Sequence, residues 1–166
     1  VFWNRVYEPW SIQRDKKIKD TLKVKGIDIN SFNGSLLWEP WEVLKNDGTS
    51  YRVFTPYYRR GCLRAKEPRV PMNTPNKFDY YELKKIISID ICNLNLLPKH
   101  NWKDKIIKNW KIGEDEAQER LEEFVHNELD GYKDGRNFPN RKNVSRLSPH
   151  IHWGEISPNT IWHRVW

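Results

Sequence analysis

The residues from Val144 to Pro149 have types and a spacing that are typical of an anion-binding helix start. This run, VSRLSP, ends a polar segment and predicts a helix start, with Ser148 as the N-cap and Pro149 at the first helical position. The unpaired N–H groups of a helix start, two serine hydroxyls and one arginine can together hold a phosphate. The ordinary alternative is a simple helix cap, and Ser157-Pro158 gives the same signal a few residues later.

Other polar side chains nearby give weaker signals. His150 and His152 are two positions apart, which places them on different faces of a helix and favours packing over a shared metal ion. Glu119, Glu122 and Glu123 are interpreted as a solvated helix face rather than a catalytic pair. No Ser-His-Asp or Cys-His arrangement can be argued from the sequence.

The composition indicates the kind of partner to expect. A net charge of +7 and a pI near 9.4 favour polyanions, since lysine and arginine release counterions from a phosphate backbone, although a merely soluble basic surface is the plain alternative. Only two cysteines occur, Cys62 and Cys92, which indicates a reducing compartment and no zinc site. No run is long enough to span a membrane, so we expect a cytoplasmic protein.

The first thirty residues predict the elements of a parallel sheet. Residues 1–6 are expected to form a buried strand, and a helix follows from Pro9 to about Lys25, with Gly26 as its stop signal. The alternation at Ile27-Asp28-Ile29 predicts a second strand. Strand, helix and strand in this length form a βαβ unit of a doubly wound sheet. It carries no glycine-rich phosphate fingerprint, so it is not an independent dinucleotide site.

The middle of the chain is irregular apart from one basic helix. Thr55-Pro56 predicts its start, by the same N-cap and first-turn signal. Aromatic and basic residues alternate along it: Tyr57, Tyr58, Arg59, Arg60, Arg64 and Lys66. Such a helix either binds single-stranded nucleic acid or packs its aromatic rings inward. Pro68, Pro71 and Pro75 then indicate a linker.

Glu114 begins the most regular predicted helix. Its apolar residues recur at three- and four-residue spacing, at Ala117, Leu121, Phe124, Val125 and Leu129. Gly131 is placed to end it, and Tyr132 follows directly.

These motifs together resemble the DNA photolyase/cryptochrome family, and bacterial-type photolyases in particular. The resemblance rests on Tyr132, on RNFP at 136–139 and on SRLSPHIHWGEISP at 145–158, which are similar to the start of that family's flavin-binding helical domain. The blocks VFWNRVYEPW at 1–10, FNGSLL at 32–37 and VFTP at 53–56 are similar to the later half of its antenna domain. The motifs follow the family's order along the whole chain.

The resemblance implies an α/β fold followed by an α-helical one. Residues 1–40 would be the C-terminal part of a Rossmann-like antenna domain with a parallel sheet. Residues 41–112 would be a long irregular interdomain linker, and residues 113–166 would be the first helices of the FAD-binding domain. Because family members are about three times as long, we expect an internal fragment that is inactive alone.

The resemblance also implies where the cofactor and DNA would bind. Residues matching the wall of the FAD cavity are Tyr132, Val144, Ser145, Arg146, Leu147 and Ser148. Arg136 matches an arginine that touches the DNA backbone, although it could equally be a surface residue that caps its loop. Many members carry threonine where Val144 stands, and phenylalanine is common at the position of Trp153, which we expect to be an aromatic core position. The residues that act in the reaction itself would lie beyond Trp166.

The implied activity is blue-light-driven repair of cyclobutane pyrimidine dimers by a deoxyribodipyrimidine photo-lyase. The implied cofactors are FAD and an antenna chromophore, either a folate or a deazaflavin. Damaged DNA would be the partner of a full-length monomer, with no metal and no membrane. Two alternatives stay open: a cryptochrome-like flavin photoreceptor, and a chain that binds nucleic acid without catalysis.

Overall fold

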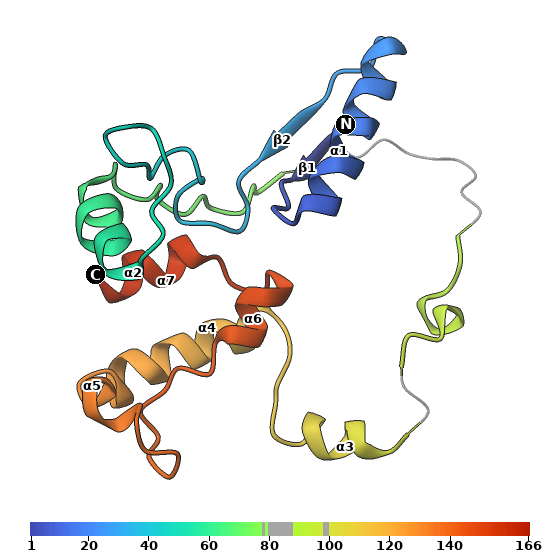
Figure 1. Ribbon diagram of the computed structural model, residues 1–166. Coiled ribbons are helices and arrows are strands. Elements are labelled where there is room, and N and C mark those ends of the chain that lie inside the picture. The colour runs from blue at the N-terminus through green and yellow to red at the C-terminus, as the bar shows by residue number, and fades with distance from the viewer. Residues whose placement is uncertain (78, 80–87, 98–99) are drawn as a thin grey trace.

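The computed structural model describes residues 1–77, 79, 88–97 and 100–166. Two groups of elements stand out in Figure 1, a strand-and-helix group near the N-terminus and a helical group near the C-terminus. The irregular segment predicted over 41–112 includes positions that lie outside the described residues. None of the described helices combines the length and the hydrophobicity that a bilayer crossing requires.

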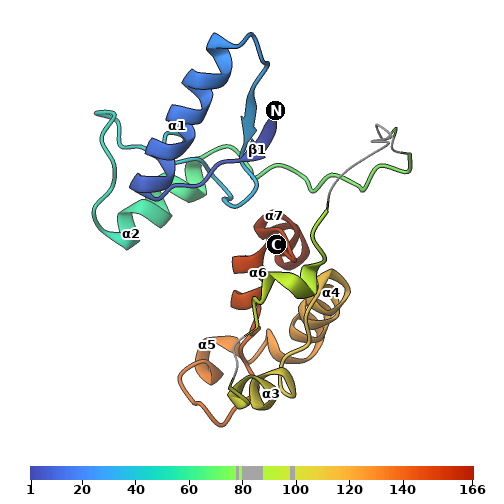
Figure 2. The ribbon, with the colours of Figure 1, turned by 90° about the vertical axis from the view of Figure 1, so that its right-hand side faces the viewer.

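The N-terminal group is the predicted βαβ unit. Strand β1 (Phe2–Asn4) pairs in parallel with β2 (Asn30–Phe32), with Phe2 opposite Asn30. Helix α1 (Pro9–Val24) connects them and lies beside the sheet (Figure 2). The stop signal is confirmed, because Gly26 has a φ of +69°. The chain therefore has an α/β fold with a small parallel sheet.

Two details of the predicted strands are wrong. The second strand begins at Asn30 rather than Ile27, because the N–H of Ile27 is still bonded to the Leu22 carbonyl at the end of α1. The first strand is not buried, since Phe2 is 71% exposed. Successive side chains of a strand point to opposite faces, and Trp3 takes the face toward α1 by donating to Asp15.

A buried carboxylate joins β1 to the turn around Glu39. Glu39 accepts hydrogen bonds from Arg5 at 2.9 Å and from the Tyr7 hydroxyl at 2.8 Å. Burial and the hydrogen bond to Glu39 raise the pKa of Tyr7 to about 12, so the phenol keeps its proton and this hydrogen bond even at alkaline pH, where an ordinary tyrosine ionises.

The predicted basic helix is present as three short consecutive turns. They are α2 (Phe54–Pro56), the π-helical turn η1 (Tyr57–Gly61) and the 3₁₀ turn η2 (Cys62–Arg64). The predicted Thr55 cap is wrong: Val53 is the N-cap residue, because its carbonyl already accepts from the Tyr57 N–H. Farther along the chain are η3 (Ile91–Leu94) and α3 (Trp102–Ile107).

The C-terminal group packs around a small apolar core. Its elements are α4 (Glu114–Glu123), the π-helical turn η4 (Phe124–Glu128), α5 (Tyr132–Gly135), α6 (Ser148–Trp153) and α7 (Pro158–Val165). The predicted apolar face of α4 is confirmed, since Ala117 and Leu121 are fully buried and pack with Leu147 and Ile156. The core therefore joins α4 to the segments on both sides of α6.

The helical run that starts at Glu114 ends at Glu128, shortly before Gly131, which has a φ of −89° and is the N-cap residue of α5. One further expectation for this group needs correction. Trp153 is not a core residue, since it is 77% exposed at the end of α6. Ile156, just after the Gly154 turn, fills the core instead.

Helix α7 contacts the first half of the chain. The rings of Trp162 and Trp38 meet edge to face at 5.4 Å, and the His163 ring lies 3.0 Å from the Pro68 carbonyl. The same helix is tied to α4 by Arg164, which makes two hydrogen bonds to the Glu122 carboxylate at 2.8 and 2.6 Å. This pairing lowers the pKa of Glu122, so that residue is an interhelical ion-pair partner rather than simply a solvated one.

The core predicts a large cost for shortening Leu121. We expect Leu121→Ala to lower the free energy of unfolding by about 3 kcal/mol, because the cavity would lie among packed side chains. Urea denaturation measures this change, and Leu96→Ala is the matched control because Leu96 is exposed. Equal effects of the two substitutions would contradict the position of the core.

Candidate functional site

The 144–148 segment is held against α4 by one side chain, Arg120. Its guanidinium donates to the backbone carbonyls of Ser145 at 2.8 Å and Val144 at 3.0 Å. It also pairs with Glu128 at 2.7 Å and Glu123 at 2.6 Å. Glu128 is buried, so its charge is offset by Arg120, and the guanidinium in turn fixes the two carbonyls.

Leu147 anchors the same segment by packing. Its side chain is 2% exposed and belongs to the core of Ala117, Leu121 and Ile156. Its carbonyl accepts the first hydrogen bond of α6, from Ile151 at 2.9 Å. Leu147 is therefore the N-cap residue, and the prediction that Ser148 caps this helix is wrong by one position. At Ser157, by contrast, the predicted cap is confirmed, since its hydroxyl accepts from the Asn159 N–H.

The backbone next to Arg146 has N–H groups that point away from Arg120. In a trans peptide the N–H points opposite to the preceding carbonyl. Because the carbonyls of Val144 and Ser145 point to Arg120, the N–H groups of Ser145 and Arg146 point away from it.

Arg146 also has a φ of +54°, and Leu147 follows with φ −82° and ψ −7°. Such a change of hand between neighbouring residues gathers successive N–H groups into a concave anion-binding nest. The N–H of Ser148, in the first turn of α6, has no intrahelical acceptor. The sequence-predicted phosphate-holding groups thus include the N–H groups of Arg146 and Ser148, with the exposed Ser148 side chain beside them.

Tyr132 begins α5, and Arg136, one turn later, is its C-cap residue. The guanidinium of Arg136 lies 5.3 Å from the centre of the Tyr132 ring and donates to its hydroxyl at 3.3 Å. The Tyr132 and Phe124 rings are perpendicular, with their centroids 5.9 Å apart. The structure thus brings together one predicted flavin residue and the predicted DNA residue. Among the described hydrogen bonds, none joins Tyr132 to the 144–148 segment.

Asn143 sets the approach of this segment to α5. Its side-chain amide donates to the Glu128 carbonyl at 3.1 Å. A Cβ at Gly131 or Gly135 would lie 2.4 or 2.3 Å from the Asn143 side chain, so neither position has room for one. The two glycines thus admit Asn143, and Asn143 connects Glu128 to the start of the 144–148 segment.

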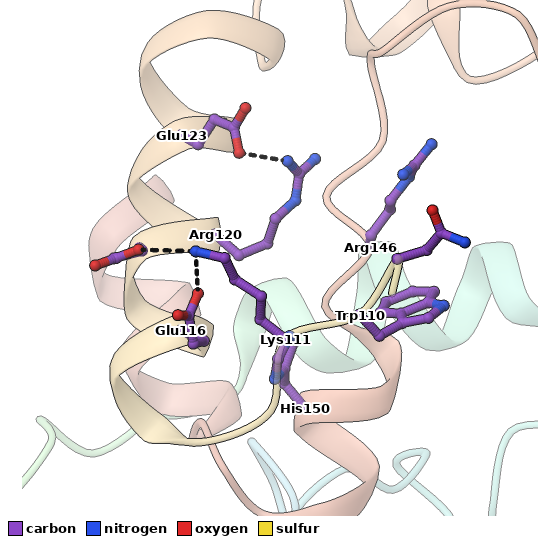
Figure 3. Close-up of a pocket in the computed structure, with 9 residues that line it drawn as sticks. Trp110, Lys111, Glu116, Arg120, Glu123, Arg146 and His150 are labelled. Atoms are coloured by element: carbon purple, nitrogen blue, oxygen red, sulfur yellow. Dashed lines mark hydrogen bonds and ion pairs between the residues drawn. The ribbon is translucent and has the colours of Figure 1, made fainter. Parts of the chain in front are cut away.

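A hollow of about 350 Å³ lies on the carbonyl side of the segment (Figure 3). It is lined by α4 on one side and by Trp110, Arg146 and His150 on the other. Its lysine and Arg120 are already paired, since Lys111 contacts Glu116 at 3.1 Å and Arg120 contacts Glu123. Carboxylates therefore neutralise much of its positive charge, and the N–H side of the segment is the better place for a phosphate.

The two histidines of α6 have different surroundings, as their spacing predicts. His150 is buried and its Nδ1 lies 2.6 Å from Glu155, whereas His152 is exposed. Within the described residues, no three or more His, Cys, Asp and Glu side chains come close enough to hold a metal ion.

Sequence reasoning missed the residues that support this segment. Arg120, Glu128 and Asn143 bind or position it, yet none belongs to the motif itself. The one local signal was the pair Gly131 and Gly135, four positions apart, which indicates a close backbone approach on a helix face.

The position of Arg120 predicts that removing this cation costs more stability than removing an exposed one. We expect Arg120→Met to lower the free energy of unfolding by about 2–3 kcal/mol, because it leaves Glu128 buried without its cation and two carbonyls without a donor. Adding Glu128→Gln should recover part of this loss, since a neutral amide is less costly to bury.

The matched control for Arg120→Met is Lys111→Met, which removes an exposed cation. We expect it to leave the free energy of unfolding nearly unchanged, because solvent screens the ion pair of this side chain with Glu116. Urea denaturation of the three variants measures the differences. Equal losses for Arg120→Met and Lys111→Met would show that the buried network does not hold the segment.

Comparison with known proteins places this arrangement in a family. The family model described as DNA photolyase matches residues 1–76. A deoxyribodipyrimidine photo-lyase of Agrobacterium fabrum is 37% identical over 98% of this chain and 34% of its own length. Cryptochrome-1 of Arabidopsis thaliana is 32% identical over 99% of this chain and 24% of its own length.

A solved structure agrees with the fold as well. The crystal structure of a bacterial class III photolyase from Agrobacterium tumefaciens matches with a TM-score of 0.90 at 37% identity, covering 98% of this chain and 34% of that one. The chain thus spans about a third of the length of that structure and of the A. fabrum relative. Sequence and fold agree over nearly its whole length: the chain belongs to the DNA photolyase/cryptochrome family.

Proposed function

We propose that the whole protein is a blue-light-driven, FAD-dependent lyase that splits cyclobutane pyrimidine dimers in DNA. The proposal rests mainly on the backbone N–H groups of Arg146 and Ser148. Hydrogen bonds from Arg120 hold this part of the backbone against α4, and Arg146 has a positive φ. A rigid array of donors is suited to the pyrophosphate of a dinucleotide. The similarity to the photo-lyase of A. fabrum supports the same reading.

In this proposal the FAD-binding residues of the chain are Tyr132, Val144, Ser145, Arg146, Leu147 and Ser148. Arg146 and Ser148 donate N–H groups, and the Ser145 and Ser148 hydroxyls add two more polar groups. Leu147 acts through its buried side chain, which keeps the segment in place. A valine at 144 offers no hydroxyl, but its carbonyl still bonds Arg120, so the position keeps its structural role. The chemistry of bound FAD would be light-driven electron transfer to the damaged bases and back.

The proposed domain boundaries are 1–40 for part of the antenna domain, 41–112 for the linker and 113–166 for the start of the FAD-binding domain. The positions of the βαβ unit and of the helices from Glu114 onward support these limits. An antenna chromophore, a folate or a deazaflavin, would belong to the first of these parts. The protein would act as a monomer.

Arg136 is the proposed contact to the backbone of damaged DNA. Its side chain is exposed, and its interaction with the Tyr132 ring holds the guanidinium over α5. Repair of a dimer within a duplex requires the damaged bases to be flipped out into a pocket. A cation fixed near the flavin-binding residues would position the distorted backbone.

A cryptochrome-like photoreceptor is the second candidate function. It is favoured by the 32% identity to Cryptochrome-1 of A. thaliana, which covers 99% of this chain. The two functions would use the same FAD wall and differ in whether dimer-containing DNA is repaired.

The backbone at Arg146 gives a test of the FAD site that does not depend on catalysis. We expect Arg146→Gly to keep most of the flavin, because glycine adopts a φ of +54° readily and the N–H groups remain. Arg146→Val should lose flavin at least about tenfold, because a β-branched residue disfavours that conformation. Flavin per protein after purification, read from visible absorbance, measures both.

The control for these variants is Arg141→Val, on an exposed residue of the preceding loop. It should leave the flavin content unchanged. If Arg146→Gly lost as much flavin as Arg146→Val, the arginine side chain rather than the backbone would be the binding group, and the N–H argument would be wrong.

The activity itself is tested on the protein encoded by the whole open reading frame. We expect bound flavin and blue-light repair of dimer-containing DNA, and we expect Arg136→Ala to weaken binding of that DNA and to reduce the salt slope by about 0.9. Flavin without repair would support the photoreceptor instead. A purified protein with no flavin would overturn both candidates.

A further inference from the structure

A basic surface lies on the first half of the chain, over α2, η1 and η2. Residues 50–66 contain five cations, Arg52, Arg59, Arg60, Arg64 and Lys66, and no Asp or Glu. Three of these cations and two aromatic residues form what we call the basic aromatic surface: Arg52, Phe54, Tyr58, Arg59 and Arg60. Its arginines are exposed, and none takes part in an ion pair with another described residue.

The aromatic side chains of this surface face solvent instead of packing inward. Phe54 is 74% exposed and Tyr58 is 39% exposed. Their rings are stacked, with centroids 5.9 Å apart and planes inclined by only 4°. Phe54 and Tyr58, four positions apart, thus display two parallel rings to solvent, so the inward-packed alternative from the sequence is wrong for this pair.

Tight packing on another side of the turns fixes this display. A Cβ at Gly61 would lie 2.6 Å from Val43 and 3.1 Å from the Tyr51 ring, so the absence of a side chain lets the 43–51 loop approach. The loop and the turns enclose an open polar hollow of about 650 Å³ that is lined by Lys45, Tyr51, Arg60 and Arg64.

One carboxylate, Asp47, also lines the hollow. It already accepts hydrogen bonds from the Thr49 N–H at 2.9 Å and the Thr49 hydroxyl at 2.6 Å. Lys45, Arg60 and Arg64 outnumber this one carboxylate, so the hollow is positively charged. Arg60 follows Tyr58 by two positions, so the hollow and the aromatic pair lie on different sides of the same short helical turns.

We propose that the basic aromatic surface and the adjoining hollow bind single-stranded nucleic acid. The arginines and Lys45 would contact the phosphates, and an unpaired base would stack on the Phe54–Tyr58 pair. A single strand is the fitting ligand because a duplex hides its base faces within the stack. Charge complementarity and a parallel, exposed aromatic face together select this class over a generic acidic partner.

This surface is separate from the proposed contact at Arg136. Helices α2 and α5 lie well apart in Figure 1 and again in Figure 2. The proposal uses no residue of the flavin site, so it goes beyond the repair function, and either can fail without the other.

The test is fluorescence anisotropy of a labelled oligothymidylate of roughly 16 nucleotides, titrated with the whole protein at several salt concentrations. Substituting Phe54→Ala with Tyr58→Ala should weaken binding about tenfold with little change of salt slope, because stacking is lost and charge is kept. Arg59→Gln with Arg60→Gln should instead reduce the slope by about 1.4, which is two single-strand phosphate contacts. Tyr58→Phe should bind as the parent does, because it keeps the ring.

The charge-matched control is Lys17→Gln with Lys25→Gln, which removes two exposed cations from the N-terminal group. It should leave both affinity and slope unchanged. Equal slopes for the two double charge variants would overturn the proposal, as would an unaltered affinity in the aromatic variant. A loss of binding to phosphatidylserine vesicles in the aromatic variant, without a loss for the oligonucleotide, would assign the surface to a membrane instead and also overturn it.

Blue-light repair of a dimer-containing duplex serves as the independent readout. It should stay at the parent level in all four variants, because none of them alters the flavin site or Arg136. If the variants of the basic aromatic surface lost both repair and oligothymidylate binding, this surface would be part of the repair site. That result would contradict the separation proposed above.

Discussion

The guanidinium of Arg120 is the interaction on which the C-terminal half of the structure depends. It offsets the charge of the buried Glu128 carboxylate and holds the carbonyls of Val144 and Ser145. Planar guanidinium groups suit this role, because their donors point in fixed directions and can serve several acceptors at once. Without the cation, a buried charge and two carbonyls would lack a partner in the same small region.

The candidate site is a consequence of that arrangement. The bond from Arg120 to the Ser145 carbonyl turns the Arg146 N–H away from Arg120, and the change of hand between Arg146 and Leu147 brings this N–H toward that of Ser148. The buried Leu147 side chain prevents the segment from moving away from α4. The motif therefore owes its geometry to side chains outside it, and the groups that would meet a phosphate are mainly backbone atoms.

The same two kinds of contact position loops in both halves of the chain. In each, a glycine without room for a Cβ allows a loop to approach a helix: Gly61 admits Val43 and Tyr51, and Gly135 admits Asn143. In each, a buried carboxylate is bonded to an arginine, as Glu39 is to Arg5 and Glu128 is to Arg120. The ionic contacts cost desolvation and are worth keeping chiefly because they fix loop geometry.

Residue patterns alone were enough to predict the family, the βαβ order and the apolar face of α4, because these depend on residue periodicity and on the order of short motifs along the chain. The sequence also identified the 144–148 segment. It misplaced the cap at Ser148, the strand at Ile27–Ile29 and the core role of Trp153, since a shift of one to three residues leaves local propensities nearly unchanged. The supporting roles of Arg120, Glu128 and Asn143, and the exposure of Phe54 and Tyr58, became evident from the three-dimensional arrangement. These facts depend on contacts between residues distant in sequence, or on which face of a helix its neighbours cover. The spacing of Gly131 and Gly135 indicates a close approach to that helix face, but it does not say which residue approaches.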